Sequence, residues 1–260
     1  MHITHVGGPT ALLSLGGLAL LTDPTFDQPG DYELPGGRTM TKLTGPAVEP
    51  AALGSIDAVL LSHDEHLDNL DRAGRALLPS VPVVLSTPGA AERIEGVTGL
   101  TNWASVELPR PDGGALTVTG LPARHGPEGC EPVTGIVTGF LLSGEDLPTV
   151  YVSGDNASVE LVSEIVERVG PVDVAVLFAG CARAAELLDG APLTLTVEDA
   201  VAAARLLDPA VIVPVHTEGW AHFSEGPDLL AAGFARAGLS DRLRLLPAGS
   251  AALINQPAPG

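Results

Sequence analysis

Two histidines and several carboxylates directly follow an apolar run in the first quarter of the chain. Residues 56–61 are mostly apolar, and they lead into Ser62-His63-Asp64-Glu65-His66-Leu67-Asp68-Asn69. Imidazole and carboxylate groups are the ligands that zinc, iron and manganese take from proteins. The end of a buried strand is a rigid base from which such side chains can be aimed at one point. The segment therefore predicts part of a metal site.

Three further polar residues have the same placement at the end of an apolar run. His125 follows residues 116–121, Asp155 follows residues 150–152 through Ser153 and Gly154, and His216 follows residues 211–215. A single His in such a turn is more often a surface residue, and an Asp before a helix is usually an N-cap. Strand ends that face one way, however, define one cleft in a sheet-based fold. Four such sites in one chain favour a joint metal centre.

The elements that must position these residues change in type along the chain. Residues 3–6, 10–15 and 18–21 predict strands separated by Gly-rich turns. Further on, strands predicted at 58–61, 81–86, 172–178 and 211–215 alternate with helices predicted at 68–78, 88–94, 156–169, 196–208 and 227–237. Strand pairs are predicted at 104–108 with 115–121 and at 134–142 with 149–153, and short closing strands at 243–245 and 251–254.

Residues 23–50 are rich in Gly and Pro and predict a long loop with no element of its own. Loops of this length in compact domains often act as lids. Tyr32, Arg38 and Lys42 lie in it and are expected either to be exposed to solvent, the more common outcome, or to reach a substrate. Elsewhere, strands buried on both faces with helices outside them predict an α/β fold with four layers, α, β, β and α. No break in composition divides the chain, so we expect a single domain over residues 1–260.

Charge and composition disfavour several classes of partner. The net charge is −19, from 13 Lys and Arg against 32 Asp and Glu, which disfavours nucleic acid and anionic membrane surfaces. No apolar run approaches the roughly 20 residues that span a bilayer. We read no signal peptide at the N-terminus and expect a cytoplasmic protein. Cys130 and Cys181 form no C-x-x-C pair and are interpreted as free thiols.

The ordered set of motifs resembles the metallo-β-lactamase-fold hydrolases, and most closely the single-domain branch that includes the ascorbate-6-phosphate lactonase type. The resemblance covers essentially the whole chain and includes residues 21–24, 62–63, 125–126, 153–155 and 214–216. It implies a four-layer αββα sandwich with two central mixed sheets and helices outside. The metal ligands that it implies are His63, His66, Asp68, His125, Asp155 and His216.

The chain departs from the H-x-H-x-D-H signature of that family. With His66 as the second histidine, Asp68 falls on the family Asp, Asn69 replaces the last His, and one extra residue separates His63 from His66. Glu65 is either a compensating ligand or a solvated loop carboxylate. The resemblance implies one nearly complete position, at His63, His66 and His125 with Asp155, and a second, at Asp68, Asp155 and His216, that has lost an imidazole. We expect one or two zinc ions, with manganese or iron as alternatives.

These residues predict a metal-dependent hydrolase that uses a metal-activated water on a small-molecule ester, lactone, amide or phosphodiester. Asp68 is the candidate to orient the water or take its proton, and His222 to protonate the leaving group. Arg183 is a candidate to bind an anionic group of the substrate, or a surface ion-pair partner. The alternatives are a degenerate, non-catalytic metal- or ligand-binding protein of the same fold, which Asn69 favours, and an iron-dependent redox role. The oligomeric state stays open, a homo-oligomer being the commonest outcome.

Overall fold

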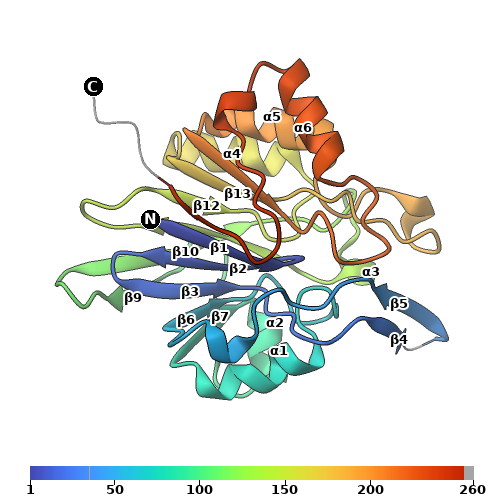
Figure 1. Ribbon diagram of the computed structural model, residues 1–260, viewed down its shortest axis with the longest axis horizontal. Helices are drawn as coiled ribbons and strands as arrows, with labels where there is room; N and C mark the ends of the chain where they lie inside the picture. The colour runs from blue at the N-terminus through green and yellow to red at the C-terminus, as the bar shows by residue number, and fades with distance from the viewer. Residues whose placement is uncertain (35, 255–260) are drawn as a thin grey trace.

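Two β-sheets face each other at the centre of the computed structural model, which describes residues 1–34 and 36–254. Figure 1 shows one outer layer formed by helices α4 (Val159–Val169), α5 (Val197–Leu207) and α6 (Pro227–Arg236). On the opposite side, α1 (Arg72–Leu77) and α2 (Pro88–Arg93) cover the other sheet. This is the predicted α/β fold with the layer order αββα.

The first sheet has seven strands in the order β15-β1-β2-β3-β6-β7-β8. Its strands β3, β6, β7 and β8 run parallel, whereas β15, β1, β2 and β3 are joined by antiparallel pairs, so the sheet is mixed as predicted. The strands are β1 (His2–Gly7), β2 (Thr10–Leu15), β3 (Leu18–Thr22), β6 (Ala58–Leu60), β7 (Val83–Ser86), β8 (Val97–Gly99) and β15 (Ala251–Leu253).

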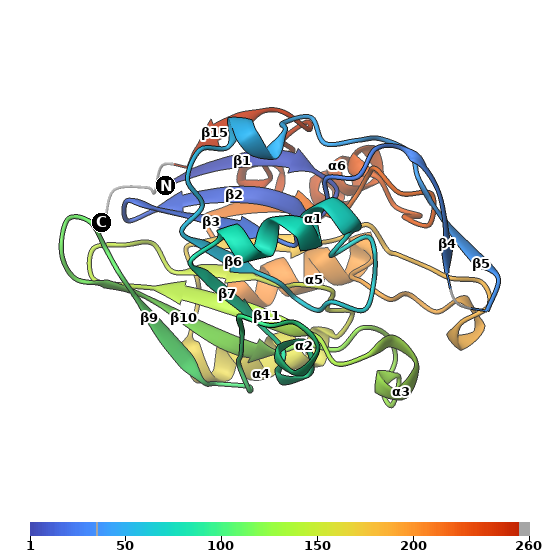
Figure 2. The ribbon, with the colours of Figure 1, turned by 90° about the horizontal axis from the view of Figure 1, so that it is seen from below.

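The second sheet has six strands in the order β14-β13-β12-β11-β10-β9. Its strands β12, β13 and β14 are parallel, and β9 to β12 pair antiparallel, so that β10 and β12 point the same way. The strands are β9 (Ser105–Pro109), β10 (Ala115–Pro122), β11 (Thr138–Ser143), β12 (Val150–Val152), β13 (Val174–Phe178) and β14 (Val211–Val215). Figure 2 shows both sheets from the side of α1 and α2.

The hydrophobic core follows the alternation of side chains along each strand. In β13, Val176 and Phe178 point between the two sheets, and Leu177 points to the helices α4, α5 and α6. In β3, Leu20 lies between the sheets and Leu21 faces the layer of α1. Successive residues of a strand point to opposite faces, and both faces are covered here. The near-continuous apolar runs in the sequence therefore reflect burial on both sides.

The predicted loop at residues 23–50 is wrong in one respect, because it contains a β-hairpin. Strands β4 (Gly30–Leu34) and β5 (Arg38–Lys42) pair antiparallel and form a sheet of their own, which projects from the body of the molecule in Figure 1. The alternation of polar and apolar residues in both strands, with Gly36-Gly37 in the turn, carried this signal. The many Gly and Pro residues on either side hid it.

Several predicted boundaries also move. The helix predicted at 68–78 begins only at Arg72, because the side chain of Asp71 caps it and residues 67–69 form a turn before it. The helix predicted at 156–169 begins at Val159 after an N-cap at Ser158. The strand predicted at 243–245 is reduced to a single bridge between Leu243 and Ile212. Among the described residues, no helix is long and apolar enough to cross a membrane.

Candidate metal centre

Five loops that follow strands meet at one edge of the two sheets. β3 leads to Asp23, β6 to the segment from Ser62 to Asn69, β10 to His125, β12 to Asp155 and β14 to His216. All five strands point to this edge because β3 and β6 are parallel in one sheet and β10, β12 and β14 share a direction in the other. Side chains far apart in sequence are thereby collected in one place, as the sequence predicts.

The first cluster consists of three imidazoles. His63 Nε2 lies 2.9 Å from His66 Nδ1, and His125 Nε2 lies 3.1 Å from the same atom. These three nitrogens belong to one group with the spacing of metal ligands. Donor atoms of one tetrahedral zinc ion, at about 2.0–2.1 Å from the metal, lie roughly 3.3 Å apart. The observed spacing is close to that value.

Hydrogen bonds behind two of the rings fix which nitrogen carries the proton. His125 Nδ1 donates to the carbonyl oxygen of Leu193 at 2.6 Å, which leaves His125 Nε2 with a free lone pair. The hydroxyl of Ser62 donates to Asp23 and so accepts from His63 Nδ1 at 3.0 Å, which leaves His63 Nε2 bare as well. The lone pairs of His63 Nε2 and His125 Nε2 therefore both face His66 Nδ1. Because His66 Nδ1 carries at most one proton, it can donate a hydrogen bond to only one of them. A cation between the three nitrogens would satisfy all of them.

Burial keeps these three imidazoles neutral at physiological pH. Burial lowers the pKa of His66 to about 4, helped by the neighbouring His125. Burial also lowers the pKa of His125 to about 4. The pKa of His63 is held well below its usual value, again by burial first and then by His66 and His125. Neutral imidazole is the form that binds metal, so the cluster is ready to accept an ion without first losing protons.

The second cluster joins two carboxylates and one imidazole. His216 Nε2 lies 3.2 Å from Asp68 Oδ2 and 3.6 Å from Asp155 Oδ1, and all three residues are buried. His216 has a φ of +58°, and its ring stacks on Phe178 at 5.4 Å between centroids. Asp155 connects the two clusters, since its Oδ2 lies 3.5 Å from His125 Nε2.

The pKa of the histidine in the second cluster is shifted in the opposite direction to those of the first cluster. Burial works to raise the pKa of Asp68, but His222 and His216 outweigh it and hold this pKa well below the usual value. Burial works to lower the pKa of His216, but Asp155 and Asp68 outweigh it and raise this pKa. Burial raises the pKa of Asp155. The second cluster therefore retains a proton on His216 more readily than the first cluster retains one on its histidines.

Unpartnered polar atoms show that a cation fits between these residues. Asp155 Oδ2 and both ring nitrogens of His216 are buried without a hydrogen-bond partner. Leaving such groups unpaired in the interior is costly, and a divalent cation would compensate Asp155 Oδ2 and His216 Nε2 directly. Imidazole together with carboxylate is also the donor set that zinc, iron and manganese use.

Asn69 lies inside the site at the position where the sequence lacks the expected histidine. Its amide nitrogen donates to Asp155 Oδ1 at 2.9 Å and to Asp23 Oδ2 at 3.1 Å. Its oxygen is buried and without a partner. The uncharged amide thus links the carboxyl groups of Asp155 and Asp23 through hydrogen bonds. A histidine at this position would instead offer an imidazole lone pair to a metal ion in the second cluster.

Glu65 lies outside both clusters. Its carboxylate forms an ion pair with Arg93 at 2.6 Å, and Arg93 also pairs with the buried Asp64. The extra residue in the His63–His66 segment is therefore accommodated by Asp64 and Glu65, which tie the loop to helix α2. Of the two alternatives that the sequence left open, this geometry matches a partly solvated loop carboxylate, 31% exposed.

His222 lies beside Asp68, within hydrogen-bonding distance of its carboxylate. His222 Nε2 is 2.9 Å from Asp68 Oδ2, and the side chain is 22% exposed. Asp68 Oδ2 is therefore flanked by His216, which is fully buried, and by His222, which is open to solvent.

Sequence reasoning did not include Asp23 among the site residues. Its carboxylate accepts hydrogen bonds from the Ser62 backbone nitrogen at 2.6 Å, from the Ser62 hydroxyl at 2.7 Å and from Asn69. Burial, reinforced by Asp155, raises the pKa of Asp23 to about 7. Asp23 follows strand β3 just as His63 follows β6, and this shared placement at a strand end was the signal that could have identified it.

A cavity of about 520 Å³ opens onto both clusters. Its apolar lining comes mainly from the β4–β5 hairpin, helix α3 (Glu131–Thr134) and the loop after β13. The lining includes His66, Asp68, His125 and His222 from the site, and Leu34, Met40, Leu67, Val133, Leu187 and Leu193 among the apolar residues. Arg38, Arg183, Glu65 and Glu186 are the lining residues outside the clusters that carry charge.

Comparison with known proteins places this geometry in a family. A family model described as a beta-lactamase superfamily domain matches residues 19–217. A UPF0173 metal-dependent hydrolase from Pyrococcus abyssi is 29% identical over 188 residues, which cover 69% of this chain and 75% of that protein. The residues matched by the family model contain all six residues of the two clusters.

Two solved structures share the fold over nearly the whole chain. An isothiocyanate hydrolase from Delia radicum gut bacteria superimposes with a TM-score of 0.80 at 22% identity, covering 97% of this chain and 99% of that one. A diiron β-hydroxylase from Streptomyces venezuelae has a TM-score of 0.68 at 18% identity, covering 97% of this chain and 54% of that one. At these identities the likeness establishes the αββα fold.

Proposed function

We propose that this chain, which belongs to the beta-lactamase superfamily and is a metal-dependent hydrolase, acts on a small, uncharged electrophile with an apolar substituent. The observation that carries this proposal is the composition of the 520 Å³ cavity next to the two clusters. A cavity of this size suits a small molecule.

The walls of the cavity favour an uncharged substrate. Leu34, Met40, Val133, Leu187 and Leu193 give it apolar surface on several sides. The two arginines of the lining, Arg38 and Arg183, are exposed to solvent, so neither presents a desolvated charge to the substrate. Arg183 also donates to the carbonyl oxygen of Gly190 at 2.7 Å, which occupies one of its N–H donors. Among the described residues that line the cavity, a phosphate or carboxylate on the substrate would meet no buried cationic side chain.

We propose that one ion binds tightly to His63, His66 and His125, with Asp155 beside them, and that a second binds weakly to Asp68, Asp155 and His216. The three imidazoles are neutral and converge, whereas the second set binds a competing proton on His216 and has Asn69 in place of an imidazole. Zinc suits three nitrogen donors, and manganese or iron suits the oxygen-rich second set.

A bound divalent ion supplies a Lewis acid that polarises the substrate and makes water acidic enough to react at neutral pH. The residues of the chain then handle the protons. Asp68 Oδ2 faces the centre and is kept ionised by two imidazoles, so it can orient the water by accepting a hydrogen bond from it. His222 contacts the same oxygen and reaches the cavity, so it can pass a proton to the leaving group.

A matched panel of substrates tests the proposal. Alkyl and aryl isothiocyanates, aliphatic lactones and neutral aryl esters are compared with versions of the same lactones and esters that carry a phosphate or a carboxylate. We expect kcat/KM to be at least about tenfold higher for the uncharged members, a difference of roughly 1.4 kcal/mol in transition-state binding. A clear preference for the phosphorylated or carboxylated members contradicts the substrate class. Metal binding without turnover of any member supports the degenerate alternative.

A further inference from the structure

Lys42 is the only lysine in the chain, and it is buried next to the metal centre. The other cationic side chains are all arginines. The Lys42 side chain is 4% exposed, although lysine is among the residues least often buried. Burying a charged group is costly unless it is paired, so the burial of the single lysine calls for a specific partner.

The ammonium group binds the loop that carries the first metal ligands. Lys42 Nζ lies 2.8 Å from Asp71 Oδ2, and Asp71 is 1% exposed. Asp71 Oδ1 accepts from the Gly74 nitrogen at 2.8 Å and thereby caps helix α1. Asp71 Oδ2 also accepts from the Asp27 nitrogen at 2.6 Å. Asp71 lies in the same loop, close after Asp68 and Asn69, so the ion pair holds the end of the loop that carries His66 and Asp68.

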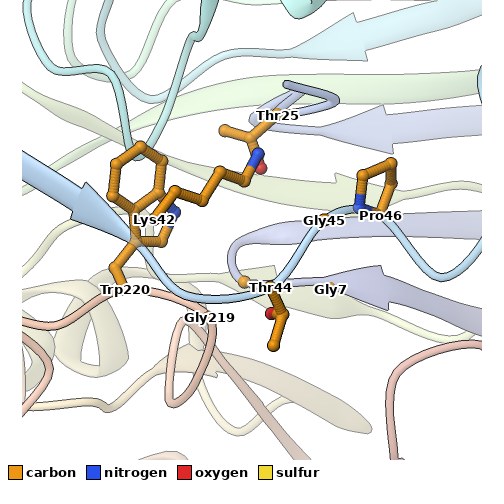
Figure 3. Close-up of a pocket in the computed structure, with 9 residues that line it drawn as sticks. Gly7, Thr25, Lys42, Thr44, Gly45, Pro46, Gly219 and Trp220 are labelled. Atoms are coloured by element: carbon orange, nitrogen blue, oxygen red, sulfur yellow. The ribbon is translucent and has the colours of Figure 1, made fainter. Parts of the chain in front are cut away.

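The backbone around Lys42 binds the loop that carries the last metal ligand. Leu43 N donates to the Gly219 carbonyl oxygen at 2.8 Å, and Ala221 N donates to the Thr41 carbonyl oxygen at 3.0 Å. Trp220 is buried between them, and its ring centroid is 5.4 Å from Lys42 Nζ. Figure 3 shows the Lys42 side chain running beside the Trp220 ring toward Thr25.

The same strand forms a wall of the substrate cavity. Thr39, Met40 and Thr41 of β5 line the 520 Å³ cavity, whereas the Lys42 side chain points to Asp71. Lys42 also borders a separate cavity of about 10 Å³ with Gly8, Thr44 and Gly219, about the size of one water. Lys42 thus contacts, through its side chain and backbone, the loop that carries His66 and Asp68 and the His216–His222 loop, while its neighbours in β5 line the cavity.

We propose that Lys42 is a positioning residue of the metal centre. Its ion pair with Asp71, here called the Lys42 clasp, holds strand β5 and the His216–His222 loop against the loop that carries His66 and Asp68. The catalytic consequence of the clasp rests on the proposed function, but its effect on metal binding does not. By reciprocity, a clasp that strengthens metal binding must itself be strengthened when metal binds.

Amine labelling tests the clasp in the unaltered protein, because Lys42 reacts only when its ammonium group leaves Asp71. Lys42 is the single lysine of the sequence, so its reaction is readily distinguished from that of the α-amino group. Acetylation of Lys42 is followed by mass spectrometry in the metal-free and zinc-loaded protein. Hydrogen exchange of strand β13, measured in parallel, reports global opening. We expect zinc to slow acetylation of Lys42 by at least about tenfold, the usual size of outer-shell effects on metal affinity, and by more than it slows exchange of β13. Equal acetylation rates with and without bound zinc overturn the proposal.

A double-mutant cycle then asks whether Lys42 acts through Asp71. Zinc affinity is measured by chelator competition in Lys42→Met, Asp71→Asn and the double variant, with Asp112→Asn, a surface ion-pair change, as the matched control. We expect each single change to weaken zinc binding about 10–100-fold, and the control to bind zinc like the wild type. The double variant should bind zinc no more weakly than the single variant with the lower zinc affinity. Zinc affinity within about twofold of wild type in Lys42→Met, or losses that add in the double variant, contradict the clasp.

If Lys42→Met does not fold, Asp71→Asn still gives an answer. This change keeps an oxygen to cap α1 and removes the charge that holds the ammonium. We expect it to speed acetylation of Lys42 at least about tenfold in the metal-free protein, and an unchanged rate contradicts the proposal. Since this measurement needs no metal, it separates failure of the clasp from failure of the proposed function.

Discussion

Lowering the pH should remove the two proposed ions in a fixed order. The structure gives the two clusters opposite proton affinities: burial lowers the pKa of His66 and His125 to about 4, whereas Asp155 and Asp68 raise the pKa of His216 against the effect of burial. Protons and metal compete for the same nitrogens. We therefore expect the ion at Asp68, Asp155 and His216 to leave first as the pH falls, and the ion at the three histidines to persist.

The size of the effect at the three-histidine position follows from the two pKa values. At pH 5 an imidazole with a pKa of about 4 is roughly 10% protonated, whereas one with the ordinary pKa of about 6.5 is roughly 97% protonated. Requiring His66 and His125 both to be neutral therefore costs about 1.2-fold in affinity, against about 1,000-fold for two ordinary imidazoles. His63, whose pKa is also lowered, adds little.

At the position formed by Asp68, Asp155 and His216, the pKa of the histidine is shifted in the opposite direction. The pKa of His216 lies above its ordinary value of 6.5, so the proton already competes with metal near neutral pH. Each further pH unit below the pKa of His216 weakens metal binding at this position about tenfold.

Equilibrium dialysis against buffered zinc at pH 8, 6.5 and 5, followed by metal analysis, measures both effects. We expect the stoichiometry to fall toward one ion per chain by pH 6.5 and to stay at one at pH 5. The reasoning is refuted if the last ion is lost between pH 7 and pH 6, as expected of solvent-exposed histidines. Circular dichroism at each pH verifies that the chain stays folded.

Three further predictions concern single residues. Asp23→Asn leaves one oxygen for the two donors of Ser62 and so disturbs the hydroxyl that orients His63. Zinc affinity should therefore fall about 10–100-fold in chelator competition, and an unchanged affinity would show that the Ser62 hydroxyl is oriented without Asp23. Asn69→His restores an imidazole to the second position, so titration calorimetry should show a second ion bound at least about tenfold more tightly than in wild type, and a weaker second ion would exclude this account of Asn69. His222→Gln removes the proposed proton donor beside Asp68, so kcat should fall about 10²–10⁴-fold while metal content stays at the wild-type level; loss of metal instead would identify His222 as a ligand.

The sequence predicted the layers and the set of clustered residues well, because both depend on local patterns. Apolar runs that end in His or Asp identify strands buried on two faces and the edge to which they point, and His63, His125 and His216 all follow such runs. The order of strands in the two sheets depends on pairings between distant segments. No local pattern in a single sequence encodes those pairings.

The sequence did not assign Asp23, and it suggested contact with a substrate for Lys42, whose side chain instead points to Asp71. Both residues act through contacts that only the fold creates. Asp23 acts on His63 through Ser62, and Lys42 meets Asp71 across a gap in sequence that includes the whole of β6. The β4–β5 hairpin was missed because Gly and Pro dominate the segment around it. The helix start at Arg72, rather than at Asp68, follows from the Asp71 cap and leaves Asp68 free to face His216.

The central claim, that these residues form a metal centre, is tested most directly by the metal content of the protein purified without chelator, in wild type and in His125→Ala. His125 joins both clusters, since its Nε2 lies near His66 and near Asp155. We predict at least one equivalent of zinc, manganese or iron in the wild type and its loss in the variant. A wild-type protein that contains no metal, and takes up none when zinc or manganese is added, would contradict the account.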